Sequence, residues 1–135
     1  MRVLDDGSGP ALYAGVSNFL TPVPGSLNAA IARWDGTSWS VVGSGVSGPV
    51  WGAAVFDDGN GPALYISNDA FFSFTNPTND ILKWDGTTWT NVGVVGGIAM
   101  NLETLDDGRG PALFVGGQTV TVNGSPTPGM ARFDG

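Results

Sequence analysis

Paired aspartates are the residues of this sequence whose type and spacing could most readily do chemistry. Two adjacent Asp residues open a loop of the pattern Asp-Asp-Gly-x-Gly-Pro, which occurs three times in 135 residues. Paired carboxylates suit hard cations such as Ca²⁺, although calcium loops usually spread their acids over alternate positions. Asp, Gly and Pro are also the residues of tight turns, so we expect structural loops, with no metal and no cofactor. A cation site is the alternative. The pairs are Asp5 and Asp6, Asp57 and Asp58, and Asp106 and Asp107.

Basic residues also recur at one position, directly before an aromatic residue and an Asp-Gly pair. They are Arg33, Lys83 and Arg132. A ring of such cations could bind an anion. Most of the twelve acids occupy repeated positions too, including Asp35, Asp85 and Asp134, so ion pairs within a unit or between neighbouring units are the simpler expectation.

Aromatic residues flank the same Asp-Gly pair on both sides. Trp34, Trp84 and Phe133 precede it, whereas Trp39 and Trp89 follow it. An exposed Trp can bind a sugar or a peptide, which makes Trp39 and Trp89 candidate ligand-binding residues. We favour the alternative, in which each aromatic pair faces across a hairpin and fixes its register.

The segments that differ between the repeats are the other candidate binding elements, because loops on a repeated scaffold commonly carry function. One of them holds the aromatic residues Phe71, Phe72 and Phe74 among Asn, Thr and Pro. This cluster is a candidate ligand site. It could equally cover a sheet edge or contact another chain.

Composition excludes several classes of function. The chain has no His and no Cys, so Ser-His-Asp and Cys-His mechanisms are excluded. An enzyme that uses carboxylates alone would need the acids outside the repeat, Asp69, Asp80 and Glu103, which show no convergent pattern; we therefore predict no enzymatic activity. The net charge of −7 argues against nucleic acid and anionic membrane surfaces as partners. No segment approaches the ~20 apolar residues of a membrane helix.

The loops and hairpins belong to a repeat with a period of about 50 residues, which is typical of a propeller blade. In the second repeat we expect antiparallel strands at Val50–Phe56, Ala63–Ile66, Asp80–Trp84 and Thr88–Val92. The Asp85-Gly86 pair between the last two favours a tight hairpin. The predicted fold class is all-β, with β-propeller blades of four antiparallel strands.

The predicted domain organisation is a single partial propeller of two and a half to three blades. The blades cover about 2–43, 50–93 and 98–135, and the third lacks its last strand. Closed propellers have about 4 to 8 blades, so an open arc would leave sheet edges and apolar faces uncovered. We therefore expect the chain to pair with itself, for example as a dimer, or with adjoining propeller segments of a longer protein.

The run Ala-Leu-Tyr/Phe followed by Ile-Ala-Arg-Trp-Asp-Gly-Thr-x-Trp resembles the repeats of kelch-like propellers. It is similar to those of fungal cortical polarity-marker proteins and bacterial secreted repeat proteins. The resemblance implies a four-stranded blade and an extracellular or cell-surface setting, and it brings no catalytic residues. The Asp-Asp-Gly-x-Gly-Pro loop departs from classical kelch repeats, which lack it.

Together these features favour a non-enzymatic propeller repeat module that acts by self-assembly or binding. The alternative is a carbohydrate-binding lectin with one aromatic-lined site per blade, for which glycans would be the partners.

Overall fold

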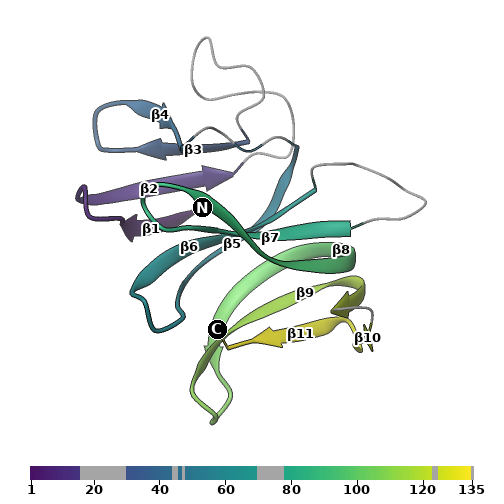
Figure 1. Ribbon diagram of the computed structural model, residues 1–135. Helices are drawn as coiled ribbons and strands as arrows, with labels where there is room; N and C mark the ends of the chain where they lie inside the picture. The colour runs from purple at the N-terminus through teal and green to yellow at the C-terminus, as the bar shows by residue number, and fades with distance from the viewer. Residues whose placement is uncertain (16–29, 44–45, 47, 70–77, 123–124, 135) are drawn as a thin grey trace.

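The computed structural model describes residues 1–15, 30–43, 46, 48–69, 78–122 and 125–134, and this part of the chain is built from strands joined by turns, without a helix. Figure 1 shows the strands in chain order. The all-β, antiparallel fold class predicted from the sequence is confirmed. Phe71, Phe72 and Phe74 lie outside the described residues.

Four short strands form the first sheet, in the order β1-β2-β3-β4. They are β1 (Arg2–Asp5), β2 (Pro10–Gly15), β3 (Ile31–Trp34) and β4 (Trp39–Val41). All three pairings are antiparallel, with Leu12 opposite Trp34 and Trp34 opposite Trp39. We call this sheet unit 1.

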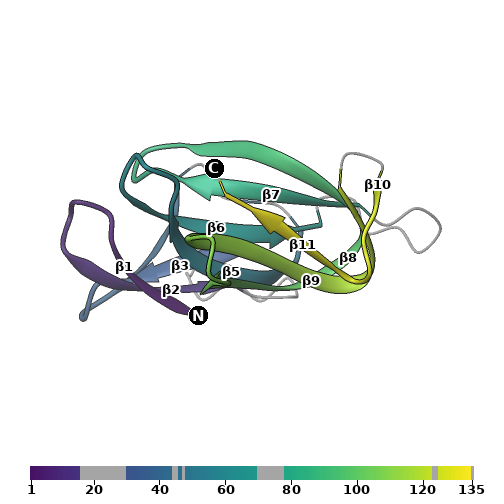
Figure 2. The same ribbon diagram turned by 90° about the horizontal axis from the view of Figure 1, so that it is seen from below.

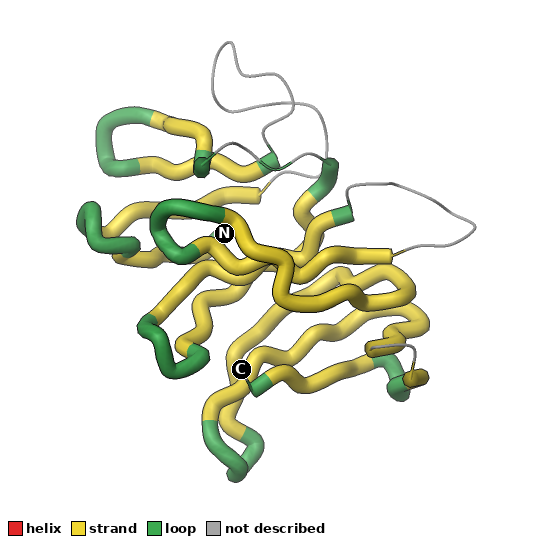
Figure 3. The backbone as a smooth tube through the Cα atoms, in the orientation of Figure 1, coloured by secondary structure: helices red, strands yellow, loops and turns green. Residues whose placement is uncertain are grey.

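Seven strands form the second sheet, in the order β10-β9-β8-β7-β6-β5 with β11 also paired to β9. Their bounds are β5 (Val50–Asp57), β6 (Pro62–Asn68), β7 (Thr78–Trp84), β8 (Trp89–Asp106), β9 (Pro111–Val122), β10 (Ser125–Pro126) and β11 (Met130–Phe133). The four strands expected in the second repeat are all present; three lie within β5, β6 and β7, and the fourth begins at Trp89 and not at Thr88. Figure 3 shows the turns that join them.

The long strand β8 differs from the prediction, which ended a strand at Val92 and began the third blade near residue 98. Its first part pairs with β7 and its second part with β9, so one 18-residue strand serves two repeats. Bulges between Ile81 and Leu82, and at two places opposite β9, bend the strand. Gly97, at a φ of 99°, lies in one of these irregular stretches. We call β5–β7 with the first part of β8 unit 2, and the rest of β8 with β9 and β11 unit 3.

The three units are stacked face to face, as two separate apolar clusters demonstrate. One cluster joins unit 1 to unit 2 and includes Leu4, Ile31, Leu64 and Trp84. The other joins unit 2 to unit 3; it includes residues of β5, β6, β7, β8, β9 and β11. Strand β6 is buried at every residue after Pro62, because both of its faces are covered. Figure 1 shows unit 2 between the other two units, and Figure 2 shows the stack from below, with β9 and β11 of unit 3 over β5 and β6 of unit 2.

Candidate functional site

The first Asp of each Asp-Asp-Gly loop closes the loop by accepting backbone hydrogen bonds. Asp57 Oδ1 accepts the N–H of Gly59 at 2.8 Å and that of Gly61 at 2.9 Å. Asp5 and Asp106 make the same pairs of bonds in their own loops. Both glycines of each loop have φ between 92° and 101°, a conformation that side chains disfavour. The structural role predicted for the first Asp is confirmed.

The second Asp of the loop lies at the centre of a partly buried polar cluster in units 1 and 2. Asp58 Oδ2 accepts a hydrogen bond from the Tyr65 hydroxyl at 3.0 Å and lies 2.5 Å from Lys83 Nζ. In unit 1, Asp6 Oδ2 accepts from the Tyr13 hydroxyl at 2.5 Å and lies 3.9 Å from Arg33 Nε. We call this Asp–Tyr–cation arrangement the triad.

Unit 3 keeps the charges of the triad but has Phe114 where the other units have Tyr. Its Asp107 is hydrogen-bonded by Arg109 at 2.7 Å, and Arg132 Nε lies 3.7 Å from the same carboxylate. Arg132 also pairs with Asp134 at 2.5 Å. The repeated cations are therefore paired with repeated acids inside each unit, which confirms the ion-pair prediction for Arg33, Lys83 and Arg132.

The pKa values of the triad follow from these contacts. The ammonium of Lys83 is the main cause that lowers the pKa of Asp58 to about 2, against the opposing effect of burial. Burial, reinforced by the neighbouring Asp6 carboxylate, raises the pKa of Tyr13 to about 12, and burial with Asp58 raises that of Tyr65. For Asp6, hydrogen bonds from Ser8 and Tyr13 outweigh burial and lower the pKa. The lowered pKa of Asp6 and Asp58 and the raised pKa of Tyr13 and Tyr65 thus favour an ionised carboxylate that accepts a hydrogen bond from a protonated phenol.

The aspartates of the Asp-Gly hairpins have a structural role as well. Asp85 Oδ1 accepts the N–H groups of Thr87 and Thr88, both at 2.8 Å, and Asp35 makes the equivalent bonds to Thr37 and Ser38. These backbone bonds lower the pKa of both carboxylates. Among the described residues, no group of three or more acids is placed to hold a metal ion.

The aromatic residues beside these hairpins form cross-strand pairs. The ring centroids of Trp34 and Trp39 are 5.4 Å apart, and those of Trp84 and Trp89 are 5.2 Å apart, with similar tilts. Trp89 Nε1 also donates a hydrogen bond to the Val42 carbonyl of unit 1 at 3.1 Å. The register-fixing pairs favoured from the sequence are confirmed, and Trp89 is engaged in packing between units.

The third member of the aromatic series packs differently. Phe133 lies against Phe56 and Tyr65, with ring centroids 6.3 Å from each, at the boundary of units 2 and 3. It stands opposite Leu113 of β9, in the position that Trp84 holds opposite Leu64.

The acids outside the repeat are spread over the fold: Asp69 follows β6, Asp80 lies on β7 and Glu103 on β8.

Arg2 is a bridging residue for which the repeat gives no signal, because no other unit has a basic residue there. Its Nε donates to the Ala53 carbonyl at 2.8 Å. Its terminal nitrogen lies 2.6 Å from Glu103 Oε2, so one side chain links units 1, 2 and 3. Glu103, for which the sequence suggested no partner, therefore forms an ion pair with Arg2.

No helix in the described part of the chain is long and apolar enough to cross a membrane. Comparison with protein-family models, with curated proteins and with solved structures finds no match to this chain.

Proposed function

We propose that the chain is a non-enzymatic β-propeller repeat module that acts by associating with a second copy of itself. The observation that supports this proposal is the repeated packing of one unit on the next. Leu4 and Ile31 of unit 1 are buried against unit 2, and the equivalent Phe56 and Ile81 of unit 2 are buried between units 2 and 3. All four are at most 5% exposed.

In the part of the chain that the structure describes, the two outer faces of the stack present the same positions without a neighbouring unit. Leu105 and Met130 of unit 3, the equivalents of Phe56 and Ile81, are 52% and 55% exposed. On the opposite face, Val3 of unit 1 is 67% exposed, whereas its equivalent Val55 packs against the cluster between units 1 and 2. Exposed apolar positions that are buried elsewhere in the same repeat favour an association site.

Head-to-tail association would place the outer face of unit 3 on the outer face of unit 1 of the second copy. Each new contact would then reproduce a packing that the chain makes twice within itself. Such an interface is heterologous, so it forms a closed ring only if the rotation closes. Two copies would supply about six units, within the range of about 4 to 8 for propellers.

Light scattering after size-exclusion chromatography, over a range of protein concentrations, tests this proposal. We expect a discrete oligomer that Met130→Glu converts to a monomer. Met100→Glu is the matched control, because Met100 is equally exposed but its equivalent, Trp51, belongs to neither apolar cluster. A chain that is monomeric throughout, or an oligomer unaffected by Met130→Glu and Val3→Glu, would contradict the proposal.

A further inference from the structure

Each Asp-Asp-Gly loop contains an Asp–Gly bond, a peptide bond that can rearrange in a protein without an enzyme. Five such bonds lie in the part of the chain that the structure describes, and three of them belong to these loops. The three are Asp6–Gly7, Asp58–Gly59 and Asp107–Gly108. Their rearrangement depends on how freely the Asp carboxyl group can approach the nitrogen of the following Gly.

The rearrangement is an attack by the backbone on its own side chain. The Gly nitrogen forms a bond to Cγ of the Asp and loses its proton, while the carboxyl group loses its hydroxyl. One water molecule therefore leaves, and a cyclic imide forms. Water then adds to a carbonyl carbon of the imide. When it adds at the former backbone carbonyl, the bond from that carbon to nitrogen breaks and isoaspartate results, with the chain running through Cγ and a free carboxylate on Cα.

The attacking nitrogen is held in the same way in all three loops. In unit 2, Gly59 N donates to Asp57 Oδ1 at 2.8 Å, and in unit 3, Gly108 N donates to Asp106 Oδ1 at 2.8 Å. Unit 1 has the equivalent bond at 3.0 Å. The φ angles of the three glycines also agree, at 92° to 98°. A difference in reactivity between the folded loops therefore depends on the Asp that supplies the carboxyl group.

That carboxyl group is anchored to a neighbouring strand in units 1 and 2. Asp58 Oδ2 accepts a hydrogen bond from the Tyr65 hydroxyl at 3.0 Å and lies 2.5 Å from Lys83 Nζ. Asp6 Oδ2 accepts a hydrogen bond from the Tyr13 hydroxyl at 2.5 Å. Both tyrosines are at most 1% exposed, so they cannot follow the carboxylate if it rotates toward the Gly nitrogen. Rotation would break a hydrogen bond to an ionised acceptor, which is among the stronger hydrogen bonds in proteins.

Unit 3 lacks this anchor, because Phe114 occupies the position of the tyrosines. Asp107 is hydrogen-bonded by the backbone and the side chain of Arg109, which belongs to the same loop. Arg132 of β11 places its Nε 3.7 Å from Asp107 Oδ2, beyond the length of a hydrogen bond. In the described part of the chain, Asp107 thus accepts no hydrogen bond from a neighbouring strand, and its carboxylate can rotate without breaking one.

We propose that Asp107–Gly108 is a site of spontaneous isoaspartate formation in the folded chain, and that the buried tyrosines of units 1 and 2 protect the equivalent bonds. The hairpin bonds Asp35–Gly36 and Asp85–Gly86 have another protection. Each of their carboxylates accepts two backbone N–H groups at 2.8–2.9 Å, against one at 3.3 Å for Asp107. The proposal concerns the loops and not the outer faces, so it stands independently of the association proposed above.

Peptide mapping by liquid chromatography and mass spectrometry tests the proposal. The full chain is incubated for several weeks in mildly acidic buffer at body temperature, and each isoaspartate peptide is separated from its isomer of equal mass. We expect isoaspartate to form about fivefold or more faster at Asp107 than at Asp6 or Asp58, the factor that one hydrogen bond of ordinary strength supplies. In guanidinium chloride, where the anchors are lost, the three rates should become similar.

Tyr65→Phe and Phe114→Tyr are reciprocal variants. Tyr65→Phe is expected to speed isoaspartate formation at Asp58 and to leave the rate at Asp107 unchanged. Phe114→Tyr is expected to slow it at Asp107, because the added hydroxyl supplies the anchor. Asp85, in the hairpin of the same unit as Asp58, is the internal control for Tyr65→Phe, since partial unfolding of unit 2 would speed both sites.

Equal rates at the three loops of the folded chain would overturn the proposal. An unchanged rate at Asp58 in Tyr65→Phe, or at Asp107 in Phe114→Tyr, would also overturn it. A rise shared by Asp58 and Asp85 in Tyr65→Phe would do the same, since unfolding and not the phenol would then set the rate.

Discussion

The Nζ atom of Lys83 lies 2.5 Å from Oδ2 of Asp58, and both side chains are about 15% exposed. The pair joins β7 to the loop between β5 and β6, so it links three neighbouring strands of the sheet. Tyr65 shares the same carboxylate oxygen.

Replacing Lys83 with Met is expected to destabilise the fold by about 1–2 kcal/mol, because Asp58 keeps its charge and its burial but loses its cation. Urea unfolding followed by Trp fluorescence measures the change. The double variant Lys83→Met with Asp58→Asn should recover part of the loss. A single variant as stable as the native chain would show that the pair contributes nothing.

Lowering the pH should remove the stabilisation of the folded state by the Asp58–Lys83 pair. The folded-state pKa of Asp58 is about 2, below the ordinary value near 3.9 of an unfolded chain, so the ionised carboxylate favours the folded state. The stabilisation is complete above about pH 5 and is lost as the pH falls through about 4 toward 2. Melting temperatures measured from pH 6 to pH 2 should fall more steeply for the native chain than for Asp58→Asn; parallel curves would contradict the assignment.

Tyr65→Phe tests the phenol of the triad. The side chain is fully buried and its hydroxyl donates to Asp58, so its loss should cost about 1–2 kcal/mol. Phe114→Tyr is the reverse change in unit 3, where Asp107 already has two arginines as partners, and we expect little effect on stability. Equal effects of the two variants on urea unfolding would argue against a specific role for the Tyr–Asp bond.

Gly52→Ala tests the close approach of the first strands of units 2 and 3. A Cβ at Gly52 would lie 2.7 Å from the backbone nitrogen of Leu102, and the backbone cannot move aside without disturbing β8. We expect a loss of about 1–3 kcal/mol from overpacking. Gly93→Ala is the control, because it adds the same methyl group in open space; a similar loss in both would attribute the effect to backbone conformation.

Features encoded within a few residues were predictable from the sequence. The Asp85-Gly86 turn, the facing Trp84 and Trp89, and the capping by Asp57 depend on contacts over two to five positions. That Lys83 pairs with a repeated acid was also predictable, because both kinds of residue recur with the repeat; that the acid is Asp58 comes from the structure. The turn, the aromatic pair and the cap each form within a single copy of the hairpin or loop.

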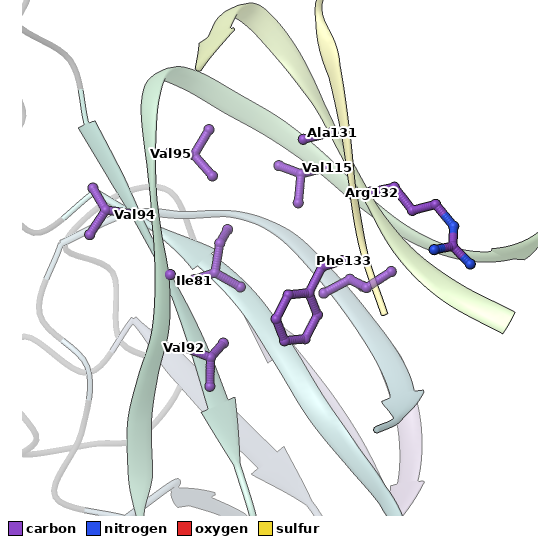
Figure 4. A pocket seen from close by; sticks show the side chains of 10 residues that line it. Ile81, Val92, Val94, Val95, Val115, Ala131, Arg132 and Phe133 are labelled. Carbon is purple, nitrogen blue, oxygen red and sulfur yellow. The ribbon is translucent and has the colours of Figure 1, made fainter. Parts of the chain in front are cut away.

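Other features depend on how distant segments meet. Arg2 bridges to Glu103 across nearly the whole chain, and neither residue has a repeated equivalent of the same charge. The continuity of β8 depends on the bulges that bend it from β7 to β9. Gly96 and Gly97 lie at one of these bulges, where the sequence pattern predicts a break between two blades. The apolar pocket of about 140 Å³ beside Phe133 (Figure 4) is lined by residues of β7, β8, β9 and β11, so it too depends on distant segments.

The shared strand β8 has a consequence for the order in which the chain unfolds. Units 2 and 3 cannot separate without breaking a single continuous strand, whereas unit 1 is a sheet of its own, held to unit 2 by side chains. In stacked repeats, cooperativity depends on such nearest-neighbour coupling. Amide hydrogens of β1–β4 should therefore exchange with solvent as one early group, and those of β5–β9 as a second, slower group.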